Sequence, residues 1–219
     1  MDDGILLIDK PPTMTSFGVV ARVRRVLSQR AGKKVKVGHT GTLDPFATGL
    51  MILVVGNECK NAEHYTKLDK VYEATIQLGQ TSTTGDPEGT ISDISKKKPS
   101  QQEINRVFKK FKGEILQRPP IFSAIKVNGR RAYTLARNGE SVEIPLRLIT
   151  IYSLELSEYV YPILKVRVHV SSGTYIRSLA FDIGAALDTG AYCSQLRRVS
   201  IADWKVEDAK VLQDFGIDN

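Results

Sequence analysis

Two long β-rich segments in the second half of the chain constrain its fold most. "LRLITIYSLELSEYV" covers residues 146–160, "ILKVRVHVSS" covers residues 163–172, and only Tyr161-Pro162 separates them. Strands joined by so short a connection pair as antiparallel neighbours, because a parallel pair needs a crossover of a dozen or more residues. The chain is therefore expected to contain an antiparallel sheet.

Helical patterns lie between the other strand-like segments. Residues 17–29 place their apolar side chains on one stripe, and Ser16 before them is the expected N-cap. Ser100 and Glu103 have the spacing of a capping box and predict a second helix, and the run "LAFDIGAALDTG" predicts a third. Because helices and strands mix without regular βαβ alternation, the class is α+β, expected as a mixed, largely antiparallel sheet flanked by helices.

The remaining segments predict further strands and two polar regions. "GLMILVVG" at 49–56 is typical of a buried strand, and "KVYEATIQLG" at 70–79 alternates with Tyr72 at the start of its apolar face. The polar residues 80–99 are expected to form an exposed loop. Residues 120–148, rich in Lys and Arg, are interpreted as an insertion rather than core.

Composition excludes several classes of function. The 219 residues suit a single domain over 1–219, and the longest apolar run, "LMILVVG", is too short to cross a bilayer. The N-terminus lacks the features of a secretory signal, so a cytoplasmic protein is expected. Cys59 and Cys193 stand alone and no phosphate-binding glycine motif occurs, so no metal site and no nucleotide cofactor are expected.

Charge is distributed unevenly along the chain. From Lys10 through Leu43 there are eight Lys and Arg residues and no Asp or Glu, although the whole chain carries only +7. Such a cluster is typical of a protein that binds a polyanion, most often nucleic acid. Asp44 follows at once, in "GHTGTLDPFATGLM". A carboxylate repels phosphate, so Asp44 serves either a structural turn, the commoner role of an Asp-Pro pair, or chemistry.

Several motifs together resemble one enzyme family. The segments "LLIDKPPTMTS", "GHTGTLDPFATGLMILVVG", "YEATIQLGQTSTTGDPEG", "PPIFSAIKVNGRRAY", "SSGTYIRSLAFDIG" and "QLRRV" occur in this order along nearly the whole chain. They resemble the TruB family of tRNA pseudouridine synthases, which modify a uridine of the T loop. The resemblance implies a pseudouridine-synthase-type fold whose basic insertion, about 120–148, is a thumb-like flap that clamps RNA.

The resemblance also implies a reaction and its catalytic residues. Uridine 55 of tRNA is flipped out of its stack and isomerised to pseudouridine without cofactor or metal, and Asp44 is the nucleophile. An acylal and a glycal route both remain open. Tyr72 stacks on the flipped base and is a candidate for proton transfer, while His39 contacts the RNA. Arg177 is the ion-pair partner of Asp44.

Further residues carry over from the same family motifs. Tyr175 and Leu196 are expected to line the uracil pocket, and Lys60 to lie beside the site. Contacts to the RNA backbone are expected from Lys10, Arg197, Arg198, Lys126, Arg130 and Arg131. An ordinary solvated pair is an equal alternative for Arg197-Arg198, and a static basic flap is the alternative for the insertion, where Gly129 and Gly139 are candidate hinges.

Two departures from the family pattern stand out. Thr13 occupies a position where relatives commonly have glycine, and the sequence ends at Asn219, where many relatives continue into an RNA-binding PUA domain. Either the protein is a natural short form or the chain has been shortened. The expected partner is the T arm of tRNA, bound by a monomer without an obligate protein partner or membrane.

Two other functions compete with this interpretation. A non-catalytic RNA-binding protein on the same scaffold would keep the charge but not need Asp44, Tyr72 and Arg177 together. A hydrolase of glycosidic bonds usually needs two carboxylates, and the motifs offer one. The isomerase is therefore favoured.

Overall fold

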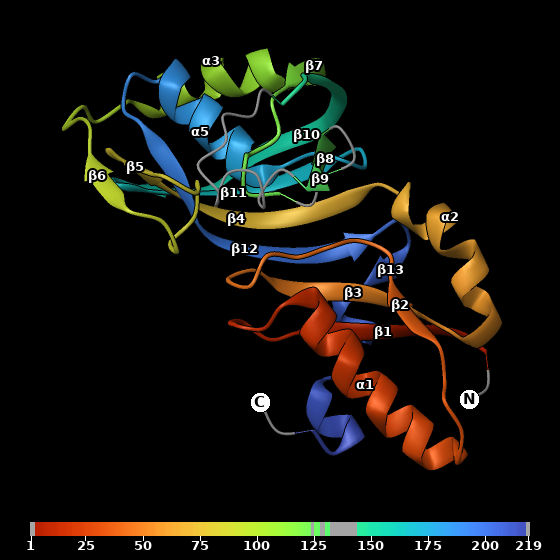
Figure 1. Ribbon diagram of the computed structural model, residues 1–219. Coiled ribbons are helices and arrows are strands. Elements are labelled where there is room, and N and C mark those ends of the chain that lie inside the picture. The colour runs from red at the N-terminus through yellow and green to blue at the C-terminus, as the bar shows by residue number, and fades with distance from the viewer. Residues whose placement is uncertain (1–2, 124, 128–129, 132–143, 218–219) are drawn as a thin grey trace. The chain divides into compact units, whose positions relative to one another are not determined.

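The computed structural model describes residues 3–123, 125–127, 130–131 and 144–217 (Figure 1). The chain divides into two compact units: unit 1 comprises Met1–Glu73 and Leu196–Asn219, and unit 2 comprises Ala74–Gln195. Strands β4 (Lys70–Leu78) and β12 (Ala191–Ile201) each run from one unit into the other. The single domain expected over 1–219 stays a prediction beside this division.

The strands of unit 1 are built around β3. Strand β1 (Gly4–Lys10) pairs antiparallel with β3 (Thr48–Val55), from Gly4 opposite Val55 to Lys10 opposite Gly49. The short β2 (Val37–His39) also pairs antiparallel with β3, whereas β12 pairs with it in parallel. The small β13 (Trp204–Lys205) pairs with β12. All residues of β3 after Thr48 are buried, as expected for this apolar run.

Helix α1 (Ser16–Ala31) lies between β1 and β2 in the chain and begins one residue earlier than predicted. Thr15, not Ser16, is the N-cap, and its side chain accepts a hydrogen bond of 3.0 Å from the Gly18 amide. Ser16 is instead buried and bonds to a distant loop. Gly32, with φ 63°, ends the helix in the left-handed conformation that glycine adopts without strain.

Short helical elements complete unit 1. They are η1 (Gly56–Asn61), α2 (Ala62–Thr66), η2 (Val206–Asp208) and η3 (Leu212–Phe215). The C-terminal segment returns to β1, where the Asp9 amide donates to the Lys210 carbonyl over 2.9 Å and the Lys210 amide donates to Leu7 over 2.9 Å. These bonds bring the last elements of unit 1 beside its first strand.

The predicted antiparallel hairpin forms the centre of unit 2. Strands β10 (Arg147–Val160) and β11 (Ile163–Val170) pair antiparallel, and β7 (Gly113–Gln117) pairs antiparallel with β10. The strand order is β4-β11-β10-β7. Figure 1 shows helices α3 (Gln101–Phe111) and α5 (Ile176–Ala186) together over one face of these strands. The expected α+β class with a largely antiparallel sheet is confirmed.

A local signal located the start of α3 correctly, whereas α5 begins three residues before the run at 179–190 that predicted it. The Ser100 side chain accepts from the Glu103 amide while the Glu103 carboxylate accepts from the Ser100 amide, so the predicted capping box is present. On β4 the alternation is confirmed, because Tyr72 and every second residue around it are buried.

No helix in the described ranges has both the length and the apolar character of a membrane span.

The first of the two polar regions contains more structure than the sequence indicated. The expected exposed loop 80–99 holds a hairpin of β5 (Gln80–Ser82) and β6 (Ile91–Asp93), and its Asp86 is only 3% exposed. Within the insertion, β8 (Lys126–Val127) pairs antiparallel with β9 (Arg130–Arg131). The candidate hinges Gly129 and Gly139 and the side chains of Lys126, Arg130 and Arg131 lie outside the described residues.

Candidate active site

Asp44 lies in the loop between β2 and β3, in unit 1. Its side chain is half-buried, and its carbonyl accepts a 3.1 Å hydrogen bond from the Ala47 amide, which closes a turn. Thr40 anchors the start of the loop, because its amide donates to the Ile52 carbonyl over 3.2 Å and its hydroxyl donates to the same atom over 3.3 Å. The structural turn expected of an Asp-Pro pair is therefore present. It places the Asp44 carboxylate shortly before the buried strand β3.

The two neighbours of Asp44 in the chain are both held by side chains from outside the loop. The Ser16 hydroxyl accepts from the Leu43 amide over 2.8 Å and donates to the Leu43 carbonyl over 2.9 Å. The Lys10 ammonium donates to the Pro45 carbonyl over 3.1 Å and to that of Pro11 over 2.8 Å. Lys10 is fully buried, so its place favours holding this loop over the predicted phosphate contact.

Arg198 contacts the loop from β12. It is 1% exposed, and its guanidinium donates from Nε to the Leu50 carbonyl over 2.7 Å and from Nη2 to the Gly41 carbonyl over 3.2 Å. The parallel register sets Arg198 opposite Gly49, whose φ is +105° and where a Cβ would overlap the Arg198 carbonyl oxygen. Only glycine allows the two strands to approach so closely. A solvated pair is therefore the wrong description of Arg198, and its burial turns the charge away from solvent phosphates.

Arg198 also influences two other basic groups in unit 1. The pKa of His39 is lowered, chiefly because burial disfavours its charged form and secondly because of the Arg198 charge. His39 Nδ1 is buried without a hydrogen-bond partner among the described residues. Both facts favour a neutral imidazole, which suits the predicted packing against RNA better than a buried cation would.

Lys70 is a buried cation that sequence reasoning missed. Its ammonium donates to the Thr66 carbonyl over 2.7 Å and to the Leu68 carbonyl, and burial, with the Arg198 charge second, lowers its pKa to about 8 while Asp69 acts in the opposite direction. The alternation of β4 gave a signal, because it puts Lys70 on the buried face with Tyr72. A lysine at a strand end is nevertheless usually exposed.

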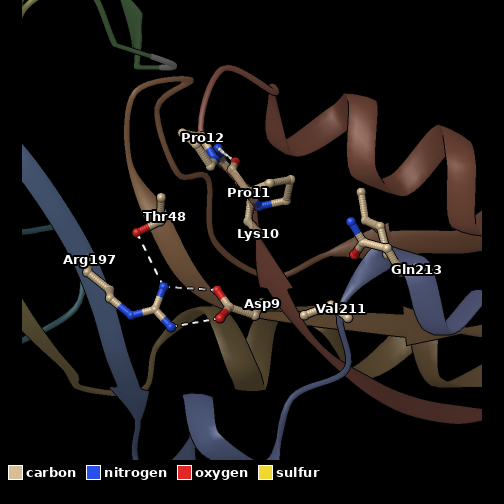
Figure 2. Close-up of a pocket in the computed structure, with 9 residues that line it drawn as sticks. Asp9, Lys10, Pro11, Pro12, Thr48, Arg197, Val211 and Gln213 are labelled. Carbon is tan, nitrogen blue, oxygen red and sulfur yellow. Dashed lines mark hydrogen bonds and ion pairs between the residues drawn. The ribbon is translucent and has the colours of Figure 1, made fainter. Parts of the chain in front are cut away.

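Arg197 lines a pocket in unit 1 (Figure 2). Its guanidinium makes a bidentate pair with Asp9, from Nη1 over 3.1 Å and from Nη2 over 2.7 Å, and Nη1 lies 3.4 Å from the Thr48 hydroxyl. Hydrogen bonding to Asp9 raises the pKa of Arg197. The pocket has a volume of about 210 Å³ and is lined by Asp9, Lys10, Pro11, Pro12, Thr48, Arg197, Val211, Leu212 and Gln213.

Neither alternative for the arginine pair, RNA-backbone contact or an ordinary solvated pair, describes both residues. Arg197 is partly exposed and paired with a carboxylate, so its contact with an RNA phosphate stays a prediction. Arg198 serves the loop instead.

Arg177 is the second residue of α5 in unit 2 and is also buried, at 4% exposed. Its Nη1 lies 3.2 Å from Asp86 Oδ2 and donates to the Thr84 carbonyl over 2.8 Å, while Nη2 donates to the Phe122 carbonyl over 2.8 Å. A surface cation is therefore excluded. The expected pair with Asp44 would join residues of different units and stays a prediction.

Asp86 pairs with the predicted site residue Arg177, although the sequence analysis did not single it out. Its Oδ1 accepts from the Thr84 hydroxyl over 2.5 Å and from the Glu88 amide over 3.0 Å, so the carboxylate is held in its own turn. Polar residues in a Gly- and Pro-containing stretch are ordinarily exposed, and burial here depends on the partner that α5 supplies.

The remaining predicted residues fall in different places. Tyr72 is buried on β4 and Leu196 is buried on β12. Tyr175 precedes α5, where Gln117 accepts from its amide over 2.8 Å and donates to its carbonyl over 3.1 Å. Lys60 is exposed on η1, after the end of β3 opposite to the Asp44 loop, so a strand of roughly 20 Å separates the two. This place does not support a position of Lys60 beside the site.

The family model described as TruB family pseudouridylate synthase (N terminal domain) matches residues 24–176. The chain belongs to this family. The match spans the Asp44 loop and Tyr72 and ends one residue before Arg177. The TruB resemblance noted from the motifs is confirmed, and with it the class of enzyme, an RNA-isomerising pseudouridine synthase.

Curated relatives agree over nearly the whole chain. The protein named tRNA pseudouridine synthase B of Phocaeicola vulgatus is 44% identical over 213 residues, which are 96% of this chain and 91% of that protein. Proteins of the same name from Azoarcus sp. and Aquifex aeolicus are 43% and 41% identical over 96% and 97% of this chain, and 69% and 73% of their own lengths.

Solved structures of similar fold are longer. The Cbf5-Nop10-Gar1 complex contains a chain with TM-score 0.75 and 31% identity, covering 97% of this chain and 53% of that one. A chain of an H/ACA RNP bound to a substrate RNA containing 2'-deoxyuridine has TM-score 0.71 and 29% identity, covering 96% and 51%. This TruB-family chain spans about half the length of these solved chains.

Proposed function

We propose that this protein converts a uridine of tRNA, at position 55 in the T loop, to pseudouridine, with Asp44 as the catalytic carboxylate. The observation that carries the proposal is Asp44 itself: a half-buried carboxylate, held at both neighbouring residues, that directly follows a stretch with eight Lys and Arg and no Asp or Glu in a TruB-family chain. The name tRNA pseudouridine synthase B of the relatives supports tRNA as substrate.

The reaction requires the target nucleotide to leave its stack, since the C1′ atom is otherwise shielded. The N1–C1′ bond breaks, and its electron pair stays with the uracil. The base then rotates, C5 bonds to C1′, the proton on C5 is removed and N1 gains a proton. Atoms and charge balance without an oxidant or a second substrate. On the acylal route Asp44 bonds to C1′ as the N1–C1′ bond breaks and leaves when C5 attacks C1′; on the glycal route Asp44 removes the C2′ proton as the N1–C1′ bond breaks and returns it when the C5–C1′ bond forms.

Other residues take roles around this carboxylate. Tyr72 offers a ring to stack on the flipped base and a hydroxyl for proton transfer. His39, kept neutral by burial, contacts the RNA where the base has left, while Tyr175 and Leu196 line the uracil. Arg177 pairs with Asp44 and keeps the carboxylate ionised, since a neighbouring cation favours the charged form of an acid.

The T arm would meet the basic part of unit 1. Six cationic side chains of residues 22–36 are exposed: Arg22, Arg25, Arg30, Lys33, Lys34 and Lys36. Together with Arg197 they form the electrostatic surface that a phosphate backbone needs, so the affinity should fall steeply with salt.

The proposal is tested with an unmodified tRNA transcript and the purified protein, and pseudouridine is mapped by base-specific chemical modification and primer extension. The wild type should give product at position 55, and Asp44→Asn should lower the rate by about 10³-fold or more, because an amide cannot act as the carboxylate does. Binding of the transcript by Asp44→Asn should stay within about twofold of wild type.

A transcript with cytidine at position 55 serves as control. Product at another uridine would overturn the assignment of position 55, and product from Asp44→Asn would overturn the role of Asp44. Tight binding without product in the wild type would favour the non-catalytic RNA-binding protein instead.

A further inference from the structure

The loop that carries Asp44 is fixed by side chains that belong to other elements. We propose that Ser16 of α1 and Arg198 of β12 are positioning residues for Asp44, acting through the backbone of Leu43, Gly41 and Leu50. This inference rests on the proposed function, because it concerns the same carboxylate.

Ser16 controls the residue directly before Asp44. Its single hydroxyl bonds to both the amide and the carbonyl of Leu43, at 2.8 and 2.9 Å, and that carbonyl belongs to the peptide group that joins Leu43 to Asp44. The side chain is 2% exposed, so water cannot easily replace these bonds. An N-cap role does not account for Ser16, because Thr15 fills that role.

Arg198 controls the width of the loop. It bonds to the carbonyls of Gly41 and Leu50, which precede and follow Asp44 in the chain, and so ties the two ends of the loop to one planar group. The guanidinium packs directly on the backbone here, because a Cβ at Gly41 would lie in van der Waals contact with it, 3.4 Å from Nη1 of Arg198. A lysine has one nitrogen and cannot span both carbonyls in the same geometry.

Such positioning matters because the carboxylate must meet one carbon of an extruded nucleotide. A displacement of about 1 Å in a reacting group can cost about 10²-fold in rate. Loss of Ser16 or Arg198 should therefore lower the chemical rate more than it lowers RNA binding.

The test measures single-turnover pseudouridine formation with saturating enzyme, together with transcript affinity and thermal unfolding. Ser16→Ala should lower the single-turnover rate about 10- to 100-fold with affinity unchanged within about twofold. Ser16→Thr, which keeps the hydroxyl, should recover most of the rate. Arg198→Lys should lose about 10-fold or more, again without loss of affinity.

Thr15→Ala is the matched control. Thr15 is the neighbouring hydroxyl residue and caps α1, but no described bond joins it to the loop, so this variant should lose stability and keep its rate. Amide hydrogen exchange adds a readout apart from activity, because the Leu43 amide should exchange faster in Ser16→Ala and not in Thr15→Ala.

The outcomes separate the two proposals. A wild type without product overturns the proposed function and this inference with it. A wild type with product, combined with full single-turnover rates in Ser16→Ala and Arg198→Lys, overturns the positioning role alone. Equal losses of rate in Ser16→Ala and Thr15→Ala would also overturn it, since they would report general stability.

Discussion

Each unit buries an arginine, and the two arginines are stabilised differently. Arg177 of unit 2 lies 3.2 Å from the Asp86 carboxylate, whereas Arg198 of unit 1 donates to the backbone carbonyls of Leu50 and Gly41. The charge of Arg198 lowers the pKa of two other basic groups, His39 and Lys70, in each case as the second cause after burial. In unit 2 a carboxylate therefore compensates the charge of the buried arginine, whereas in unit 1 the positive charge of Arg198 lies beside the loop of Asp44.

This contrast suits the proposed reaction. Positive potential from its own unit stabilises a carboxylate that must stay ionised while half-buried. The cost is repulsion among the buried cations, which an RNA-isomerising site can tolerate because its substrate is anionic.

The largest effect is expected from breaking the pair in unit 2. Asp86→Asn leaves Arg177 as a buried cation with one charge partner fewer, so the free energy of unfolding should fall by about 3 kcal/mol. Denaturant unfolding measures the loss. In the double variant with Arg177→Gln, the loss should be smaller than the sum of the two single losses.

Asp188→Asn is the control for this pair, because Asp188 makes an exposed ion pair with Lys97 at 3.3 Å in the same unit. Its loss should stay within about 1 kcal/mol. Equal losses for Asp86→Asn and Asp188→Asn would show that Asp86 does not compensate a buried charge.

A smaller effect, dependent on pH, is expected at Lys70. Its pKa is lowered to about 8 in the folded protein from 10.5, so the unfolded chain binds more protons between these values and stability rises with pH there. Between pH 7 and 10 the wild type should therefore gain about 2 kcal/mol relative to Lys70→Met. Denaturant unfolding at several pH values measures this gain.

Lys67→Met provides the comparison, because Lys67 is an exposed lysine that pairs with Glu63 at 2.8 Å. The difference between this variant and the wild type should stay flat from pH 7 to 9. A flat curve for Lys70→Met as well would mean that the ammonium of Lys70 reaches water.

The smallest effect is expected at His39. Arg198→Met removes the second cause of the lowered pKa of His39 and keeps the first, burial, so the pKa should move part of the way up toward 6.5. Imidazole resonances followed by NMR across pH report the change. Arg25→Met, an exposed cation on α1, should leave the His39 titration in place. An unchanged pKa in Arg198→Met would remove Arg198 from the surroundings of His39.

Much of the fold followed from short-range patterns in the sequence. The connection at Tyr161-Pro162 required the β10–β11 hairpin, Ser100 and Glu103 marked the start of α3, and the alternation of β4 placed Tyr72 on a buried face. The motifs also located Asp44 in a loop before a buried strand. Each of these inferences depends on residues only a few positions apart, whose steric and hydrogen-bonding preferences act locally.

The tertiary structure alone decided which charged residues are buried. The sequence analysis expected Lys10 and Arg198 to contact the RNA backbone, and it did not single out Lys70 or Asp86. Burial of these four was not predicted, because a charge is normally costly to bury. Burial becomes tolerable only where partners far along the chain satisfy the group, as Gly41 does for Arg198 and Arg177 does for Asp86. The sequence by itself indicated the main helices and strands and singled out Asp44 as the candidate acid, and long-range packing decided what holds that residue in place.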